Sequence, residues 1–201
     1  MSCWASSSDG RPRRRLLAGA AALTLLLALL PGAGAVPALA KVFLSVDEAV
    51  RLAFPGCQVT RRTAFLTPEQ LRRARELAGA EVPSALVNYY EAKRDGRSAG
   101  VAYFDTHRVR TLPETLMIVV DPQGKVARLE VISFREPEEY MPRGAWYEQF
   151  RGRGLDRDLQ LKAGIHPVTG ATLTARATTD AVRRVLALHQ VILQGGQGAK
   201  P

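Results

Sequence analysis

Hydroxyl groups and small side chains gather in one stretch near the C-terminus: Thr169, Gly170, Ala171, Thr172, Leu173 and Thr174. Apolar residues then recur every three or four positions, which predicts an amphipathic helix from residue 175 to about residue 194. Its expected buried face consists of Ala177, Ala181, Val182, Val185, Leu186 and Ile192. Free amides at a helix N-terminus attract anions, and Gly170 with Ala171 would let the backbone approach a ligand closely. We therefore predict a phosphate site here. The alternative is an ordinary helix start that Thr172 or Thr174 caps.

The order of these residues is similar to a known motif. Thr169-Gly170-Ala171-Thr172, followed by Thr174 and a helix rich in Ala and Val, resembles the attachment motif of the covalent FMN-binding domain. That family includes flavin subunits of the RNF complex and of the sodium-pumping NADH:quinone oxidoreductase, and small exported flavoproteins. The resemblance implies that Thr172 carries FMN through a phosphoester and that the rest of the stretch binds the cofactor. The family often has an acidic residue three positions before the first hydroxyl residue, where this chain has His166.

The resemblance also implies a function and partners. We expect an exported flavoprotein that carries electrons on covalent FMN, rather than an enzyme with its own small substrate. A separate Mg²⁺-dependent flavin transferase would attach the FMN from FAD, and redox partner proteins or a quinone would exchange electrons with it. Two alternatives remain open: an FMN-dependent reductase of a quinone or other small acceptor, and a non-redox envelope binding module in which residues 169–174 only cap the helix.

The N-terminus has the three parts of a secretory signal: a basic run at residues 11–15, an apolar run at residues 16–30, and small residues ending at Ala38-Leu39-Ala40. Cleavage after Ala40 would leave Lys41 as the first residue, with residues 41–201 as the FMN-binding domain. An uncleaved anchor and a twin-arginine signal are alternatives. Each alternative places the domain in the periplasm or on the outer face of the cytoplasmic membrane.

Composition limits the remaining function classes. The formal net charge is +9, of which the expected signal segment holds +3, leaving +6 for residues 41–201. This surplus could favour acidic partners or anionic lipid, but no basic stripe with interleaved aromatic residues indicates nucleic-acid binding. Cys57 would be the only cysteine after cleavage, which excludes an intrachain disulfide and favours a lone buried thiol. His107, His166 and His189 do not have the spacing of a zinc site.

The elements expected to position the stretch form an α+β domain: an antiparallel sheet of about five strands flanked by helices. Capping boxes at Ser45 and Thr67 predict helices to about residues 54 and 78. Strands are expected at residues 57–65, 85–93, 98–106, 115–120 and 125–134, with hairpin turns at Asp95-Gly96 and at residues 121–124. The imperfect alternation in the last strand predicts a bulge or a strand partly covered on both faces.

Two further segments carry groups that could do chemistry. Asp105 and His107 suggest an acid–base pair, but no nucleophile is placed beside them by spacing, so we interpret them as solvated charges at a strand end. A polar loop at residues 135–142 leads to a short helix at residues 144–150, on which Trp146 and Phe150 share one face. These rings would anchor the helix to the core, or the loop and helix would form one wall of the flavin pocket.

Overall fold

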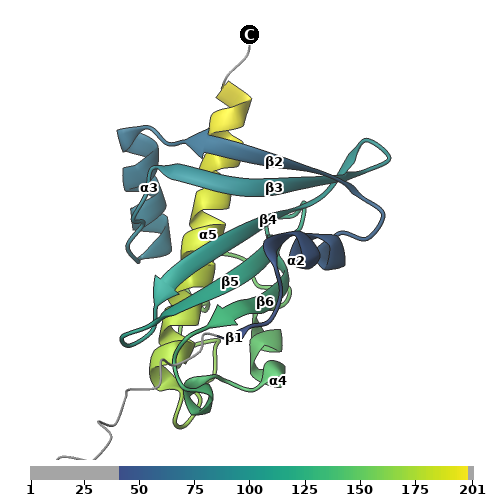
Figure 1. The fold of residues 1–201 in the computed structure, drawn as a ribbon. Helices are drawn as coiled ribbons and strands as arrows, with labels where there is room; N and C mark the ends of the chain where they lie inside the picture. The colour runs from purple at the N-terminus through teal and green to yellow at the C-terminus, as the bar shows by residue number, and fades with distance from the viewer. Residues whose placement is uncertain (1–40, 199–201) are drawn as a thin grey trace, which may run out of the picture. The chain divides into compact units, whose positions relative to one another are not determined.

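Six strands form one antiparallel sheet in the order β1-β6-β5-β4-β3-β2, with helices on both faces (Figure 1). The computed structural model describes residues 41–198, so the predicted signal segment and its cleavage site lie outside the described residues. The α+β prediction is confirmed. The sheet contains the five expected strands and one additional short strand, β1. The strands are β1 (Lys41–Val42), β2 (Gln58–Phe65), β3 (Leu86–Arg94), β4 (Arg97–Arg108), β5 (Pro113–Val120) and β6 (Val126–Phe134). The helices are α2 (Val46–Ala53), α3 (Pro68–Ala78), α4 (Gly144–Tyr147) and α5 (Thr172–Gly198), with 3-10 turns η2 (Glu138–Tyr140) and η3 (Glu148–Phe150).

Local signals place most of these boundaries. Both capping boxes form: the side chain of Ser45 accepts from the amide of Glu48, and the side chain of Thr67 accepts from the amide of Gln70. The β3–β4 hairpin turns at Asp95 (φ 50°) and Gly96 (φ 75°), the pair of positive φ angles that a type I′ turn requires. The β5–β6 ladder has two register shifts, which confirms the predicted bulge.

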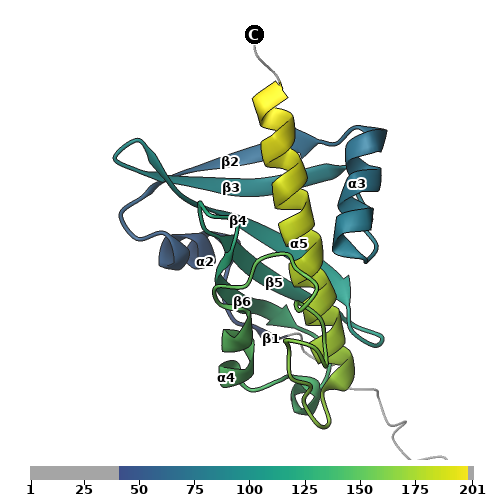
Figure 2. The ribbon, with the colours of Figure 1, turned by 180° about the vertical axis from the view of Figure 1, so that it is seen from behind.

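The sheet separates two hydrophobic clusters. α5 and α3 cover one face and α2 lies on the other, as the two opposite views show (Figures 1 and 2). Residues of β5 alternate between the clusters: Leu116 and Ile118 belong to the α5 side, and Met117 and Val119 to the α2 side. β5 is therefore buried on both faces, which explains its continuous run of apolar residues.

The last helix is longer than predicted. α5 begins at Thr172 rather than Ala175 and runs to Gly198. Val182 and Val185 are buried, as expected of its inward face. Polar residues of α5 are buried too, among them Thr178, Arg184 and His189. Because α5 packs against both the sheet and α3, more than one stripe of the helix is covered, and its buried polar groups need partners.

Candidate functional site

The predicted phosphate site lies at the first turn of α5. The carbonyl of Ala171 accepts the first helical hydrogen bond, from the amide of Ala175 at 2.9 Å, so Ala171 is the N-cap residue. Its methyl group cannot accept a hydrogen bond, and within residues 41–198 the amides of Thr172, Leu173 and Thr174 have no acceptor. The expectation that Thr172 or Thr174 caps the helix is therefore wrong. Uncapped amides at the positive end of a long helix favour an anion.

The three threonines of the motif differ in solvent exposure. Thr169 and Thr172 are exposed, and Thr172 Oγ1 makes only a 3.3 Å bond to the carbonyl of Val168. Thr174 is 1% exposed, and its hydroxyl donates to the carbonyl of Tyr140 at 2.5 Å. The hydroxyl proton of Thr174 is therefore already donated to the carbonyl of Tyr140. Of the two hydroxyls in the first turn of α5, only that of Thr172 is open to a reagent.

The turn before α5 has the room and backbone shape for a ligand. Gly170 adopts φ +83°, a conformation that side-chain-bearing residues rarely adopt. No atom lies within 4 Å of the position that a Cβ would take there. The turn is therefore open at its tip, and Gly170 is required by the backbone conformation rather than by crowding.

The short helix after the polar loop contacts the chain just before the motif. Trp146 Nε1 donates to the carbonyl of His166 at 2.7 Å, and Gln149 Oε1 accepts from the amide of His166 at 2.8 Å. The rings of Trp146 and Phe150 lie on one face with centroids 5.3 Å apart and are buried, as predicted. These bonds fix the chain that leads into the motif, because both the amide and the carbonyl of His166 are hydrogen-bonded. That the segment forms a wall of the flavin pocket stays a prediction.

Tyr140 links the motif to the connection between β4 and β5. Its carbonyl accepts from Thr174, and its ring lies under the guanidinium of Arg110 at 4.6 Å from the centroid. The carboxylate of Glu136 accepts the amides of Arg110, Thr111 and Leu112 at 2.7–3.1 Å. The loop before α4 is thus tied to the β4–β5 connection at one end and to α5 at the other.

Asp105 and His107 are not solvated charges, so that interpretation is wrong. Their side chains are each 10% exposed, and His107 lies between two carboxylates: Nδ1 is 2.9 Å from Asp105 Oδ1 and Nε2 is 3.0 Å from Glu114 Oε2. Arg184 of α5 completes the cluster with two 2.8 Å bonds to Asp105. Antiparallel pairing of β4 with β5 sets His107 directly opposite Glu114, which only the register of the hairpin could have indicated.

The two carboxylates determine the protonation of His107. Burial alone would lower the pKa of His107, but hydrogen bonds to Asp105 and Glu114 and the charges of both raise it to about 9. The imidazolium then donates from both nitrogens. Burial would raise the pKa of Asp105, but bonds from Arg184 and His107 lower it below its usual value. We refer to Asp105, His107, Glu114 and Arg184 as the buried ion cluster.

The buried ion cluster fixes α5 on the sheet. Thr178 lies on α5, a few residues after the motif, and its Oγ1 donates to Glu114 Oε2 at 3.3 Å. Glu114 Oε1 and the hydroxyl of Tyr147 are buried without a partner in the described part of the chain. Burial and the charge of Glu114 both raise the pKa of Tyr147, so these two groups lie in one environment. The cluster therefore positions the helix whose first turn carries the motif.

Within residues 41–198 no three His, Cys, Asp or Glu side chains come together as metal ligands. His189 is a buried core residue whose Nδ1 lies 3.0 Å from the hydroxyl of Tyr103. Cys57 is half-buried and free. In the described part of the chain, no helix is both long and apolar enough to cross a bilayer.

Comparison with known families agrees with this geometry. Residues 112–187 match the family model described as the FMN-binding domain. The matched stretch runs from the start of β5 to within α5 and includes Glu114, the loop that contacts His166, and the whole motif at residues 169–174. No curated protein matches the chain.

Proposed function

We propose that this chain carries electrons on an FMN joined to Thr172 by a phosphoester, because the match of residues 112–187 to the FMN-binding domain supports a flavin-binding protein. One observation supports the attachment point above all others: an exposed hydroxyl stands at the first helical residue of α5, beside three amides that have no acceptor within residues 41–198. A phosphodiester at this position keeps its remaining negative charge at the positive end of the helix. Arg176, exposed one turn further on, adds a positive charge to that face of the helix.

The residues of the motif have separate roles in this proposal. Thr172 supplies the oxygen that bonds to phosphorus, losing its proton, with AMP as the leaving group when FAD is the donor. The amides of Leu173 and Thr174 would hold the phosphate of a bound FMN, while the Thr174 hydroxyl holds the turn to Tyr140. Gly170 gives the turn its shape, and Thr169 with Ala171 completes the motif that the flavin transferase recognises. The bound FMN supplies one- and two-electron redox chemistry, and the protein supplies its orientation and exposure.

The solvent exposure of the motif supports a function as an electron carrier. Thr169, Gly170 and Thr172 are exposed, so a redox partner protein or a quinone can approach the same surface. Covalent attachment also suits a protein outside the cytoplasm, where a dissociated cofactor is lost by dilution. We therefore propose export to the periplasm or to the outer face of the cytoplasmic membrane, directed by residues 1–40.

Intact mass and in-gel flavin fluorescence test the attachment. The full chain is expressed with a flavin transferase in an export-competent host and denatured before analysis. Wild type and Thr172→Ser should retain flavin, although Ser can lower the yield. Thr172→Ala should carry none, because alanine has no oxygen to form the ester. Thr169→Ala is the matched control and should still be modified. Wild-type protein of unmodified mass, or modified Thr172→Ala, contradicts the proposal.

Turnover with a soluble acceptor separates a carrier from a reductase. A carrier should exchange electrons with a partner protein but show little steady-state reduction of a soluble quinone analogue on its own. Rapid turnover without a partner would favour the reductase instead. N-terminal sequencing of the same preparation should begin at Lys41, and retention of Met1 would indicate a membrane-anchored form.

A further inference from the structure

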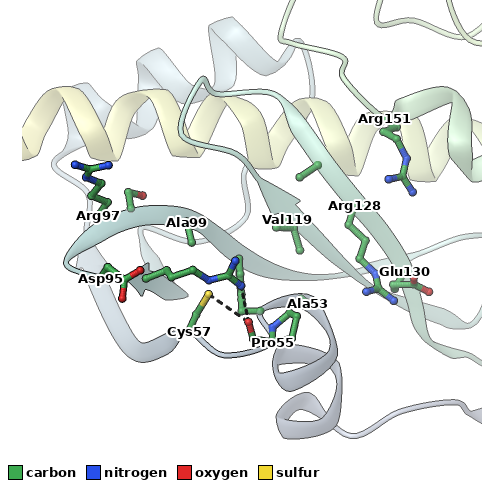
Figure 3. Close-up of a pocket in the computed structure, with 14 residues that line it drawn as sticks. Ala53, Pro55, Cys57, Asp95, Arg97, Ala99, Val119, Arg128, Glu130 and Arg151 are labelled. Atoms are coloured by element: carbon green, nitrogen blue, oxygen red, sulfur yellow. Dashed lines mark hydrogen bonds and ion pairs between the residues drawn. The ribbon is translucent and has the colours of Figure 1, made fainter.

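A hollow of about 930 Å³ lies on the α2 face of the sheet, opposite to the face that α5 covers (Figure 3). It extends from the β3–β4 hairpin to the first half of β6. The cofactor motif belongs to the other face, and none of its residues lines this hollow. The hollow therefore needs an explanation of its own.

Small side chains and a short helix create the hollow. α2 ends at Ala53, and the chain turns away through Phe54 and Pro55. Beyond that point the apolar side chains that the sheet contributes to the lining are Ala99, Val119 and Ala127, one from each of three strands. These side chains are too short to fill the layer that a longer helix would have occupied. The result is a small apolar floor in which Ala99 and Ala127 are partly exposed.

Arginines surround the floor. Arg94 and Arg97 lie at the hairpin end, Arg128 and Arg151 at the β6 end, and the acidic side chains in the lining are Asp95 and Glu130 (Figure 3). At the β6 end Arg151 is paired with Glu148 at 2.8 Å and Arg128 with Glu130 at 2.8 Å. The unbalanced positive charge of the lining therefore lies at the hairpin end.

Several of these arginines are held in place. Arg94 Nη2 donates to the carbonyl of Pro55 at 2.5 Å, and Arg128 donates to the carbonyl of Leu52 at 3.0 Å and to Glu130 at 2.8 Å. Each guanidinium has five N–H donors, so donors remain on both after these bonds. Fixed guanidinium groups lose less conformational entropy when they bind a carboxylate.

We propose that this hollow is a docking site for a protein partner that presents an apolar side chain flanked by carboxylates. The apolar side chain would cover the alanine floor, and the carboxylates would pair with Arg94 and Arg97 at the hairpin end. A small anion is a poorer match, because the hollow is open along its length and a small ligand needs to be mostly enclosed. Arginine next to apolar surface is typical of protein interfaces. A second copy or residues 1–40 would bring mainly like charge, since both are basic.

Binding of a short peptide tests the docking site. The probe is a fluorescein-labelled Glu-Glu-Leu-Glu-Glu peptide, followed by anisotropy against the full chain; the Thr172→Ala variant can be used equally, so the result does not depend on flavin attachment. The peptide should bind, and raising the salt concentration from about 20 mM to about 300 mM should strongly weaken the binding. The same peptide with Lys in place of Glu should not bind. Equal binding of both peptides, or no binding of the acidic one, overturns the proposal.

Two variants separate this site from general surface charge. Arg94→Ala with Arg97→Ala removes both arginines of the hairpin end and should weaken binding about tenfold. Arg72→Ala with Arg73→Ala removes the same charge from the exposed face of α3 and should change binding less than about twofold. If both double variants weaken binding equally, the attraction is unspecific and the docking site is overturned.

The floor is tested without changing charge. Replacing the peptide's Leu by Gly should weaken binding to wild type, and Ala127→Leu should remove that difference, because the added side chain fills the floor. If citrate displaces the acidic peptide at equal concentration, the hollow is a small-anion site and the protein-docking proposal is wrong.

Discussion

The guanidinium of Arg184 on α5 forms two 2.8 Å hydrogen bonds with the carboxylate of Asp105 on β4. Their side chains are 11% and 10% exposed, so the pair is largely removed from water. Arg184 also donates to the carbonyl of Glu81, in the connection between α3 and β3. One side chain thus joins the last helix, a central strand and a loop of the sheet, and it fixes the direction in which the first turn of α5 points.

Arg184→Ala should lower the free energy of unfolding by about 3 kcal/mol, because it leaves Asp105 buried with one partner fewer. The matched control is Arg72→Ala on α3, whose ion pairs are exposed and should contribute less than about 1 kcal/mol. Urea denaturation followed by far-UV circular dichroism measures both. Equal losses in the two variants would show that burial of the Asp105 pair adds no stability.

Stability should fall between pH 6.5 and about 9. Folding raises the pKa of His107 from 6.5 to about 9, so the folded state holds the proton more tightly than the unfolded chain. The stability from this proton is complete below pH 6.5 and is lost as the pH rises through 9. A shift of this size corresponds to roughly 3 kcal/mol. The pKa of Asp105 is lowered in the folded state, so the contribution of its ionised carboxylate to stability is lost only in acid.

His107→Gln provides the control for this pH dependence. Glutamine has no proton to lose in this range, so the decline between pH 6.5 and 9 should flatten. Urea midpoints measured at several pH values give both curves. The explanation is wrong if wild type and His107→Gln decline in parallel.

The sequence predicted what depends on neighbouring residues and missed what depends on distant ones. Capping at Ser45 and the turn at Asp95-Gly96 need only four or five adjacent residues, and both are present as predicted. His107 was misread because its partners are Glu114, set opposite by the hairpin register, and Asp105, whose charge is balanced by Arg184 on a helix far along the chain. No local pattern contains this information.

Within the six-residue motif, too, a feature that depends on neighbouring residues was predicted and a feature that depends on a distant residue was missed. The motif's position at a helix start followed from the apolar spacing, which is local. The burial of Thr174 did not, because its acceptor is the carbonyl of Tyr140 in a separate loop. The starting residue of α5 was also missed, since nothing in the spacing shows that Thr172 and Leu173 already have helical geometry.

Gly170→Ala should destabilise the protein by about 1 kcal/mol through backbone strain alone. The residue has φ +83°, which costs an L side chain about that much, and no neighbouring atom would clash with the added methyl group. Gly144→Ala is the control, because Gly144 also has open space around it but lacks a positive φ. Thermal unfolding compares the two. A neutral Gly170→Ala would mean that the turn relaxes to another conformation without cost.

Thr172 and Thr174 should separate flavin attachment from stability. Valine has the shape of threonine without the hydroxyl, so the two Thr→Val variants differ only in which oxygen is lost. Thr174→Val breaks the bond to Tyr140 and should lower the free energy of unfolding by about 1 kcal/mol while covalent flavin remains. Thr172→Val should leave stability nearly unchanged, because its 3.3 Å bond to Val168 is weak and exposed, yet no covalent flavin should form. Urea denaturation and intact mass on the same samples give the two readouts. Loss of flavin in Thr174→Val but not in Thr172→Val would move the attachment to Thr174 and would require the bond to Tyr140 to open first.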